Sequence, residues 1–275
     1  MPAPVASATS TDQAVAYQLD PAHDGNQTGS PITAPLSLVW SVKLLGSISY
    51  PLIVNGVVYV TAGSTANGYG TTLYALDQAT GTTLWSQSLG GIYAWSGLAY
   101  DAGQVFTVNY SGTLSAFNAA TGAIDWSRSL PGQYAFSSPP TATDGYVYTG
   151  GAGSGGTVYA VSEATGQLAW TASVENGDHS SPAVDSSGVY VTYAGDQDYA
   201  FAPFTGALLW HHQTDVAGGG GKTPVLAAGD IFGRDALRGA TWCCRRAGVR
   251  VSAPSRRHRP RRSRAGRRTQ SRAER

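Results

Sequence analysis

Hydrophobic and polar positions alternate in short runs over most of the chain, and turn-forming residues separate the runs. In SYPLIVNGVVYV two apolar runs flank Asn55-Gly56, and in LYALDQATGTTLW two runs flank Thr80-Gly81. A period of two is typical of half-buried strands, and glycine tolerates the positive φ that tight hairpin turns need. The pattern therefore predicts an all-β protein built from hairpins.

The second of these hairpins recurs at a nearly constant spacing. Its four copies are LYALDQATGTTLW, LSAFNAATGAIDW, VYAVSEATGQLAW and DYAFAPFTGALLW. Their Thr-Gly pairs are 41, 44 and 40 residues apart, and LSLVWSVKL carries the final tryptophan of a fifth copy at Trp40. A period of about 20 to 50 residues is typical of a repeat architecture.

Another hairpin lies between each tryptophan and the next Thr-Gly turn, so each period holds four short strands. This matches a β-propeller blade, a four-stranded sheet that buries both faces against its neighbours. The repeats occupy residues 36–235, after an extended segment at 1–35. We expect an incomplete ring of about four blades and a fragment, near residues 48–87, 95–128, 136–171, 179–212 and 222–232.

A tryptophan ends the outer strand of every copy, and a glycine occupies the turn before it in the four complete copies. A large flat ring can pack between adjacent blades while its N–H reaches a backbone carbonyl. We therefore assign a structural role to Trp40, Trp85, Trp126, Trp170 and Trp210, and to Gly81, Gly122, Gly166 and Gly206.

The turn cores follow the pattern A-x-[DN]-x-x-T-G-x-x-x-W from Ala75 to Trp85 and from Ala116 to Trp126, while Ser162 and Ala202 replace the Asp/Asn in later copies. This pattern resembles the pyrroloquinoline-quinone-like (PQQ-like) repeats of quinoprotein β-propellers. The resemblance implies either a cofactor-free scaffold of the bacterial envelope or a quinone-dependent alcohol dehydrogenase. It also implies that pyrroloquinoline quinone and calcium are possible cofactors, and that the protein is extracellular or belongs to the cell envelope.

The stretch GGGGKTP, Gly218 to Pro224, matches part of the sequence motif of phosphate-binding loops. The full motif G-x-x-x-x-G-K-[ST] needs a glycine at position 216, where this chain has Val216, and a helix after Thr223. Thr223-Pro224 instead aligns with Ser181-Pro182 of the preceding repeat. We interpret the stretch as the loop before an inner strand.

Charge divides the chain into an acidic body and a basic tail. Residues 1–230 carry three cations against fifteen carboxylates, and residues 231–275 carry fifteen arginines against two carboxylates. Such an abrupt change is typical of out-of-frame translation of GC-rich codons, so we expect a frameshift or truncation near Asp235. The tail at 236–275 is then disordered and binds polyanions without selectivity, with no specific nucleic acid as partner.

The tail also contains Cys243-Cys244, an adjacent pair that resembles the disulfide of quinoprotein dehydrogenases. Since the pair lies outside the repeats, we interpret it as a coincidence. The N-terminus shows no signal peptide, and no segment is long and apolar enough to span a membrane.

The loops that enter the inner strands should meet at one mouth of the central channel, where binding sites form. The repeats place Trp95, Phe136, His179 and Lys222 at nearly equivalent positions there, with Tyr93, Tyr134 and Asp178 beside them. Aromatic rings with a cation, an imidazole and a carboxylate can hold a planar or sugar-like ligand. The alternative is that these are ordinary loop and core residues.

No catalytic residue and no metal site can be assigned. His211-His212 are adjacent on a strand and point to opposite sides, which makes a poor chelate. We therefore predict a non-enzymatic binding or scaffold module that holds a protein, small-molecule or carbohydrate ligand at its mouth. The alternative is a fragment of a PQQ- and calcium-dependent dehydrogenase. Open blade edges also predict self-association.

Overall fold

The computed structural model describes residues 13–27, 34–64, 69–193, 195, 197–213, 221–234 and 241–245. Its strands are β1 Leu52–Val54, β2 Val57–Gly63, β3 Thr71–Asp77, β4 Thr83–Gly90, β5 Ser96–Asp101, β6 Gln104–Asn109, β7 Thr113–Asn118, β8 Ile124–Ser129, β9 Thr141–Thr143, β10 Tyr146–Ala152, β11 Gly156–Ser162, β12 Leu168–Val174, β13 Ala183–Asp185, β14 Gly188–Tyr193, β15 Gln197–Phe201, β16 Leu208–His212, β17 Val225–Ala227, β18 Asp230–Arg234 and β19 Thr241–Arg245.

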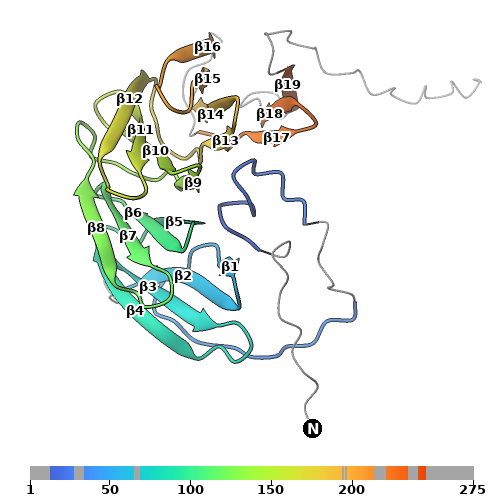
Figure 1. Cartoon of the computed structure of the whole chain (residues 1–275), viewed down its shortest axis with the longest axis vertical. Helices are drawn as coiled ribbons and strands as arrows, with labels where there is room; N and C mark the ends of the chain where they lie inside the picture. The colour runs from blue at the N-terminus through green and yellow to red at the C-terminus, as the bar shows by residue number, and fades with distance from the viewer. Residues whose placement is uncertain are drawn as a thin grey trace, which may run out of the picture.

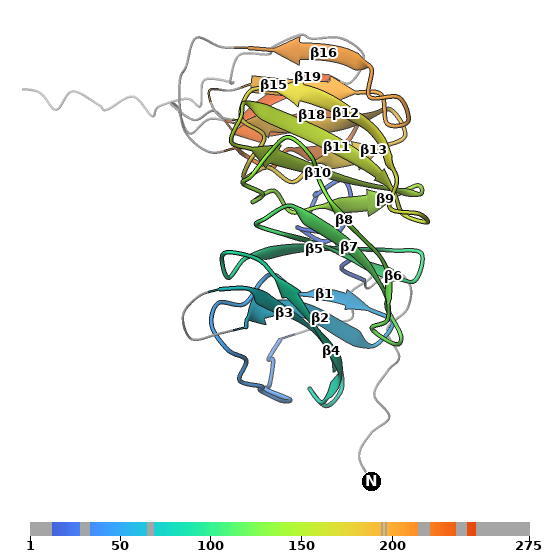
Figure 2. The same ribbon diagram turned by 90° about the vertical axis from the view of Figure 1, so that its left-hand side faces the viewer.

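These strands form five antiparallel sheets. Four sheets have four strands in sequence order, and the fifth consists of β17, β18 and β19. Figure 1 shows an open arc in which the first strand of each sheet lies on the inner side and the last strand on the outer side. Figure 2, which faces the outer side of the arc, shows the sheets stacked one after another. The predicted propeller of four-stranded blades is confirmed, and no described strand closes the ring between the fifth sheet and the first.

Burial decreases from the inner strands to the outer one, as wedge-shaped packing around an axis requires. In β6 five of six residues are buried, whereas β8 alternates between exposed and half-buried positions. Phe106 and Val108 of the second sheet share a cluster with Tyr159 and Val161 of the third. The core therefore lies between neighbouring sheets. No helix in the described part of the chain could cross a membrane.

Four of the repeat tryptophans pack on the turn glycine of the blade that follows them. The Trp126 indole N–H donates to the Glu163 carbonyl at 2.6 Å, and a Cβ on Gly166 would lie 2.7 Å from the Trp126 ring. The indole of Trp85 donates to Ala119 O beside Gly122. The remaining pairs of this kind are Trp40 with Gly81 and Trp170 with Gly206.

Residues 13–27, which we call the axial segment, cross the inner side of the arc. Backbone bonds join Ala14 to Ile53 of β1, Val15 to Tyr100 of β5, Pro21 to Val184 of β13 and Ala22 to Leu226 of β17. The His23 imidazole lies 3.3 Å from the Thr141 hydroxyl of β9. The segment therefore contacts the inner strand of every described sheet (Figure 1).

Both ends of the chain differ from the expectation. The axial segment is not simply extended, because Gln18, Leu19 and His23 have positive φ and Ala16 bridges back to Leu19. Within the tail, residues 241–245 form β19 and pair with β18, so the fragment becomes a three-stranded sheet. The remainder of residues 236–275, together with Asp235 and the expected frameshift, lies outside the described residues.

Candidate binding site at the mouth of the propeller

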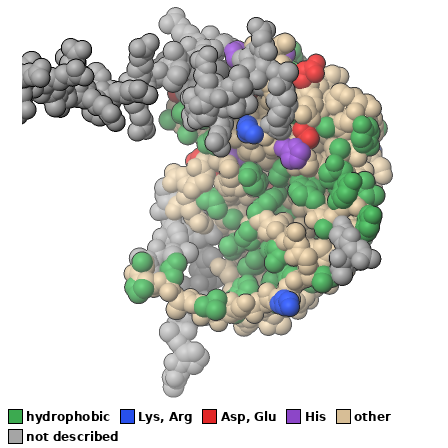
Figure 3. Space-filling model, turned by 180° about the vertical axis from the view of Figure 1, so that it is seen from behind, with side chains coloured by type: hydrophobic (Ala, Val, Ile, Leu, Met, Phe, Trp, Pro, Cys, Tyr) green, Lys and Arg blue, Asp and Glu red, His purple; other side chains and the backbone are tan. Residues whose placement is uncertain are grey.

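The loops that lead from one blade into the next lie on the same face as the β2–β3, β6–β7 and β10–β11 connections, because each of the first four blades has four strands that alternate in direction. Figure 3 shows the face that carries exposed histidine side chains, where hydrophobic side chains gather and charged ones are few. Ile92, Tyr93 and Tyr134 of the connecting loops are at least half exposed. This mouth is therefore an apolar, weakly charged surface.

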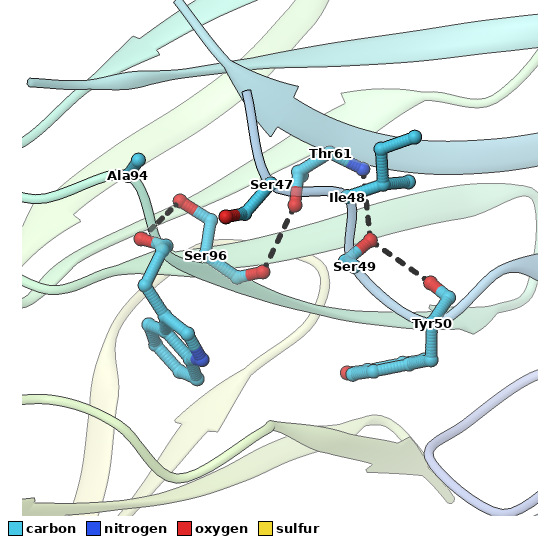
Figure 4. Close-up of a pocket in the computed structure, with 8 residues that line it drawn as sticks. Ser47, Ile48, Ser49, Tyr50, Thr61, Ala94 and Ser96 are labelled. Atoms are coloured by element: carbon cyan, nitrogen blue, oxygen red, sulfur yellow. Dashed lines mark hydrogen bonds between the residues drawn. The ribbon is translucent and has the colours of Figure 1, made fainter. Parts of the chain in front are cut away.

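A pocket of about 220 Å³ opens between the first and second blades. It is lined by Ser47, Ile48, Ser49, Tyr50, Thr61, Ala94, Trp95 and Ser96. Figure 4 shows Ser47, Ser49 and Tyr50 on the strand that enters β1, opposite Ala94 and Ser96. The volume is below the roughly 300 to 1,000 Å³ of sites for drug-sized ligands. The pocket suits one side chain or one sugar ring better than a tricyclic quinone.

Hydrogen bonds within its wall fix most of the pocket's hydroxyl groups. The Ser49 hydroxyl accepts from Thr61 N and donates to Tyr50 O, both at 2.9 Å. The Thr61 hydroxyl donates to Ser96 O at 3.1 Å, and the Ser96 hydroxyl donates to Trp95 O at 2.8 Å. The bond from Thr61 to Ser96 links the two blades, and the other bonds hold the wall of each blade in place.

The Tyr50 ring closes the pocket toward the axis. Its hydroxyl donates to Leu98 O at 2.6 Å and accepts from Leu98 N at 2.7 Å. Burial raises the pKa of Tyr50, so the phenol stays neutral. With Trp95 and serine hydroxyls as its other walls, the pocket offers an aromatic and polar surface without a charge.

The structure distributes the predicted site residues over three environments. Trp95 lines the pocket, and Tyr93 stands near it with its ring edge against Tyr110 at 4.7 Å between centroids. Tyr134 lies one blade further, where its hydroxyl donates to Gly153 O at 3.0 Å. Phe136 has no exposed surface and packs in the core beside Tyr159, so it is a packing residue and not a ligand contact.

The charged candidates lie across the mouth, on the fourth and fifth blades. His179 Nδ1 is 2.9 Å from Asp178 Oδ2, and the imidazole is largely exposed. The Lys222 main chain joins the blades, since its N–H donates to Thr192 O and its carbonyl accepts from the Thr192 and Ser180 hydroxyls. The seven predicted residues therefore lie on several blades of the mouth.

Sequence reasoning missed the serine and threonine part of the pocket. Ser49, Ser96, Ser138 and Ser180 precede successive inner strands, and Ser138 and Ser180 bond the loop of the following blade. Hydroxyls at this repeat position were visible in the recurring Ser/Thr-Pro entries. Their role as pocket wall depends on the close approach of two blades, which a repeat pattern does not specify.

The sequence model of a protein family described as outer membrane protein assembly factor BamB matches residues 33–91 and 70–264. The chain belongs to this family. Its blades are PQQ-like repeats, as the turn motif indicated. No curated protein matches the chain significantly.

Solved structures share the fold of this BamB-type chain at low sequence identity. A europium-containing methanol dehydrogenase has a TM-score of 0.72 at 17% identity, over 88% of this chain and 58% of that one. BamB from Moraxella catarrhalis has a TM-score of 0.55 at 23% identity, over 74% of this chain and 62% of that one. Quinohemoprotein alcohol dehydrogenase from Comamonas testosteroni has a TM-score of 0.68 at 20% identity, over 90% of this chain and 49% of that one. The chain spans about half to three-fifths of these proteins, and the likeness shows the fold alone.

The inner side of the arc does not fit the quinone and calcium ion that a dehydrogenase needs there. The axial segment already occupies the edges of the inner strands, and His23 bonds the neutral Thr141 and Ser181 hydroxyls and faces Pro224 O. Calcium prefers six to eight oxygen ligands, several of them carboxylates. No group of three or more His, Cys, Asp or Glu side chains within the described ranges could hold a metal ion.

Proposed function

We propose that this BamB-type propeller is a non-enzymatic binding module of a secreted or cell-envelope bacterial protein, and that its mouth holds a protein partner. The observation that carries the proposal is the axial segment, which crosses the inner side of the arc and bonds the edges of its inner strands. The binding surface is then left to the mouth, with its exposed Ile92, Tyr93 and Tyr134 and the pocket beside Trp95.

The chemistry of the mouth suits a protein partner. Tyrosine and tryptophan are enriched in the anchor positions of interfaces, where a large rigid ring contributes area at low entropic cost. A pocket of about 220 Å³ with hydroxyl walls can accept one apolar or hydroxylated side chain. A carbohydrate ring is the smaller ligand that fits the same features, because sugars stack on aromatic faces and bond to hydroxyls.

The second candidate is a fragment of a PQQ- and calcium-dependent dehydrogenase. It is favoured by the higher TM-score to methanol dehydrogenase, 0.72 against 0.55 for BamB. We give this difference in TM-score less weight than the position of the axial segment. At such low identity, dehydrogenases and BamB proteins share the same fold.

Two measurements on the full chain separate the candidates. Calorimetric titration of pyrroloquinoline quinone with Ca²⁺ should give no saturable heat, and micromolar binding would establish the dehydrogenase fragment instead. A photo-crosslinking residue at Tyr134 should capture a defined envelope protein that is not captured from Asp144, an exposed position in the β9–β10 turn on the opposite face. Equal capture from both positions, or from neither, would contradict the assignment of the mouth.

A further inference from the structure

The segment 36–44, LSLVWSVKL, lies at one end of the arc in the position of an outer strand. The Trp40 indole donates to Gln78 O at 2.8 Å, and the ring covers Gly81 as Trp85 covers Gly122. Trp40 and Leu44 pack against Val58 and Val60 of the first blade. The segment therefore sits where the fourth strand of a preceding blade belongs.

No other strand of that preceding blade occurs among the described residues. Leu36, Leu38 and Val39 are 73%, 84% and 79% exposed, and no β-ladder bond reaches the segment 36–44 from the described chain. Apolar side chains on an unpaired strand are a template for pairing with another sheet.

The other end of the arc has the complementary gap. Among the described residues, the sheet β17–β18–β19 has no strand beyond β19, whereas the other four sheets have a fourth strand at this place. Figure 1 shows β19 and the segment after residue 34 at opposite ends of the open arc. A strand that packs on the first blade of its own chain is therefore remote from β19 of that chain.

We propose that the strand 36–44 of one copy pairs with β19 of a second copy and completes the fifth blade in trans. The contact joins different surfaces of the two copies, so it is heterologous and propagates head to tail. The partner is a second copy because the described part of one chain supplies both a strand without a sheet and a sheet without a fourth strand.

The repeat fixes the register of this pairing. Within complete blades the third and fourth strands place Ala75 opposite Trp85 and, after a bulge, Leu76 opposite Thr83. In the fifth sheet Phe232 lies opposite Cys243, as Tyr59 lies opposite Ala75 in the first. The equivalent pairing therefore puts Cys243 of the second copy opposite Trp40 of the first and Cys244 opposite Leu38, and leaves Val39 in the bulge.

Cysteine cross-linking of the full chain tests this register. In a Cys243→Ser background, Leu38→Cys should form an intermolecular disulfide with Cys244 under mild oxidation, because directly opposed residues have Cα atoms within disulfide range. The matched control Val39→Cys, at the bulge position, should cross-link at least fivefold less. Mass spectrometry of the linked peptides identifies the pair, and further replacement by Cys244→Ser should abolish the product.

The second test measures the molar mass in solution by light scattering after size-exclusion chromatography. The mass of the wild-type chain should rise with concentration. Because successive backbone N–H groups point to opposite edges of a strand, one of Leu38→Pro and Val39→Pro should abolish the rise while the first blade, held by Trp40, stays folded. A monomeric mass at every concentration, or equal cross-linking from positions 38 and 39, would overturn the proposal.

Discussion

Four tryptophan–glycine junctions, at Trp40, Trp85, Trp126 and Trp170, repeat a single contact, whereas the axial segment makes a different contact at each blade. At every junction an indole N–H donates to the carbonyl three residues before a turn glycine, at 2.6 to 3.0 Å. Across the axis, Ala14, Pro21 and Ala22 use backbone bonds and His23 uses its ring.

The difference concerns how each contact supports the arc. A junction joins two neighbouring parts of the arc, so its loss should destabilise only those parts. The same contact recurs in each copy of the repeat. The axial segment joins five sheets at once and has no second copy. Variants of the two regions should therefore differ in magnitude and in their dependence on pH.

The largest expected effect comes from a junction glycine. Gly166 has a φ of 68°, and an added Cβ would lie 2.7 Å from the Trp126 ring. We expect Gly166→Ala to lower the free energy of unfolding by about 4 kcal/mol, about 1 to 2 from the left-handed backbone and the rest from the steric overlap. Urea unfolding monitored by tryptophan fluorescence measures the loss.

Gly145 of the same blade is the matched control. Its φ is 83°, but no atom lies within 4 Å of the position that a Cβ would occupy. Gly145→Ala should therefore cost only the backbone part, about 1 to 2 kcal/mol. Equal losses in the two variants would show that the ring of Trp126 moves aside and that the junction is not tightly packed.

The same contrast explains which features the sequence predicts. The blades follow from alternation and from the period of the Thr-Gly turns, because each copy of the motif makes its contact within one repeat length. The axial segment has no periodic signal, since Pro21 and Val184 are brought together only by the curvature of five sheets. Phe136 and Trp95 occupy equivalent repeat positions, yet one is core and the other lines a pocket.

The next largest effect concerns His23, whose imidazole is buried against Thr141, Ser181 and Pro224 O, with the Tyr17 ring edge nearby. Burial lowers the pKa of His23 to about 4, against 6.5 in the unfolded chain. Between these values the unfolded state binds the additional proton, so stability falls as pH decreases from 6.5 to 4. The expected loss is about 3 kcal/mol.

His23→Gln should remove this acid-side slope, because glutamine keeps polar atoms in the site and does not titrate. Urea unfolding at pH 4, 5, 6 and 7 gives the slope for each variant. An unaltered slope in His23→Gln would show that the axial segment does not respond to pH through this residue.

The last comparison distinguishes one junction from the other three by its dependence on pH. Glu163 supplies the carbonyl for Trp126, and its side chain is buried where Gln78, Ala119 and Pro203 stand at the equivalent positions. Burial, followed by the neighbouring carboxyl groups of Asp101 and Asp144, raises the pKa of Glu163 to about 8. The native state therefore keeps a proton that the unfolded state loses above pH 4.5, so stability falls as pH rises from 4.5 to 8.

Glu163→Gln mimics the protonated acid and should flatten this alkaline slope while leaving stability near pH 5 within about 1 kcal/mol of wild type. The control is Asp77→Asn, which gives the first turn the residue type that Asn118 provides in the second. The hydrogen bonds of Asp77 from Thr80 lower the pKa of its carboxyl, so Asp77→Asn should not change the slope above pH 5. If the wild-type slope persists in Glu163→Gln, the carboxyl is already ionised in the native protein, and all four junctions respond to pH alike.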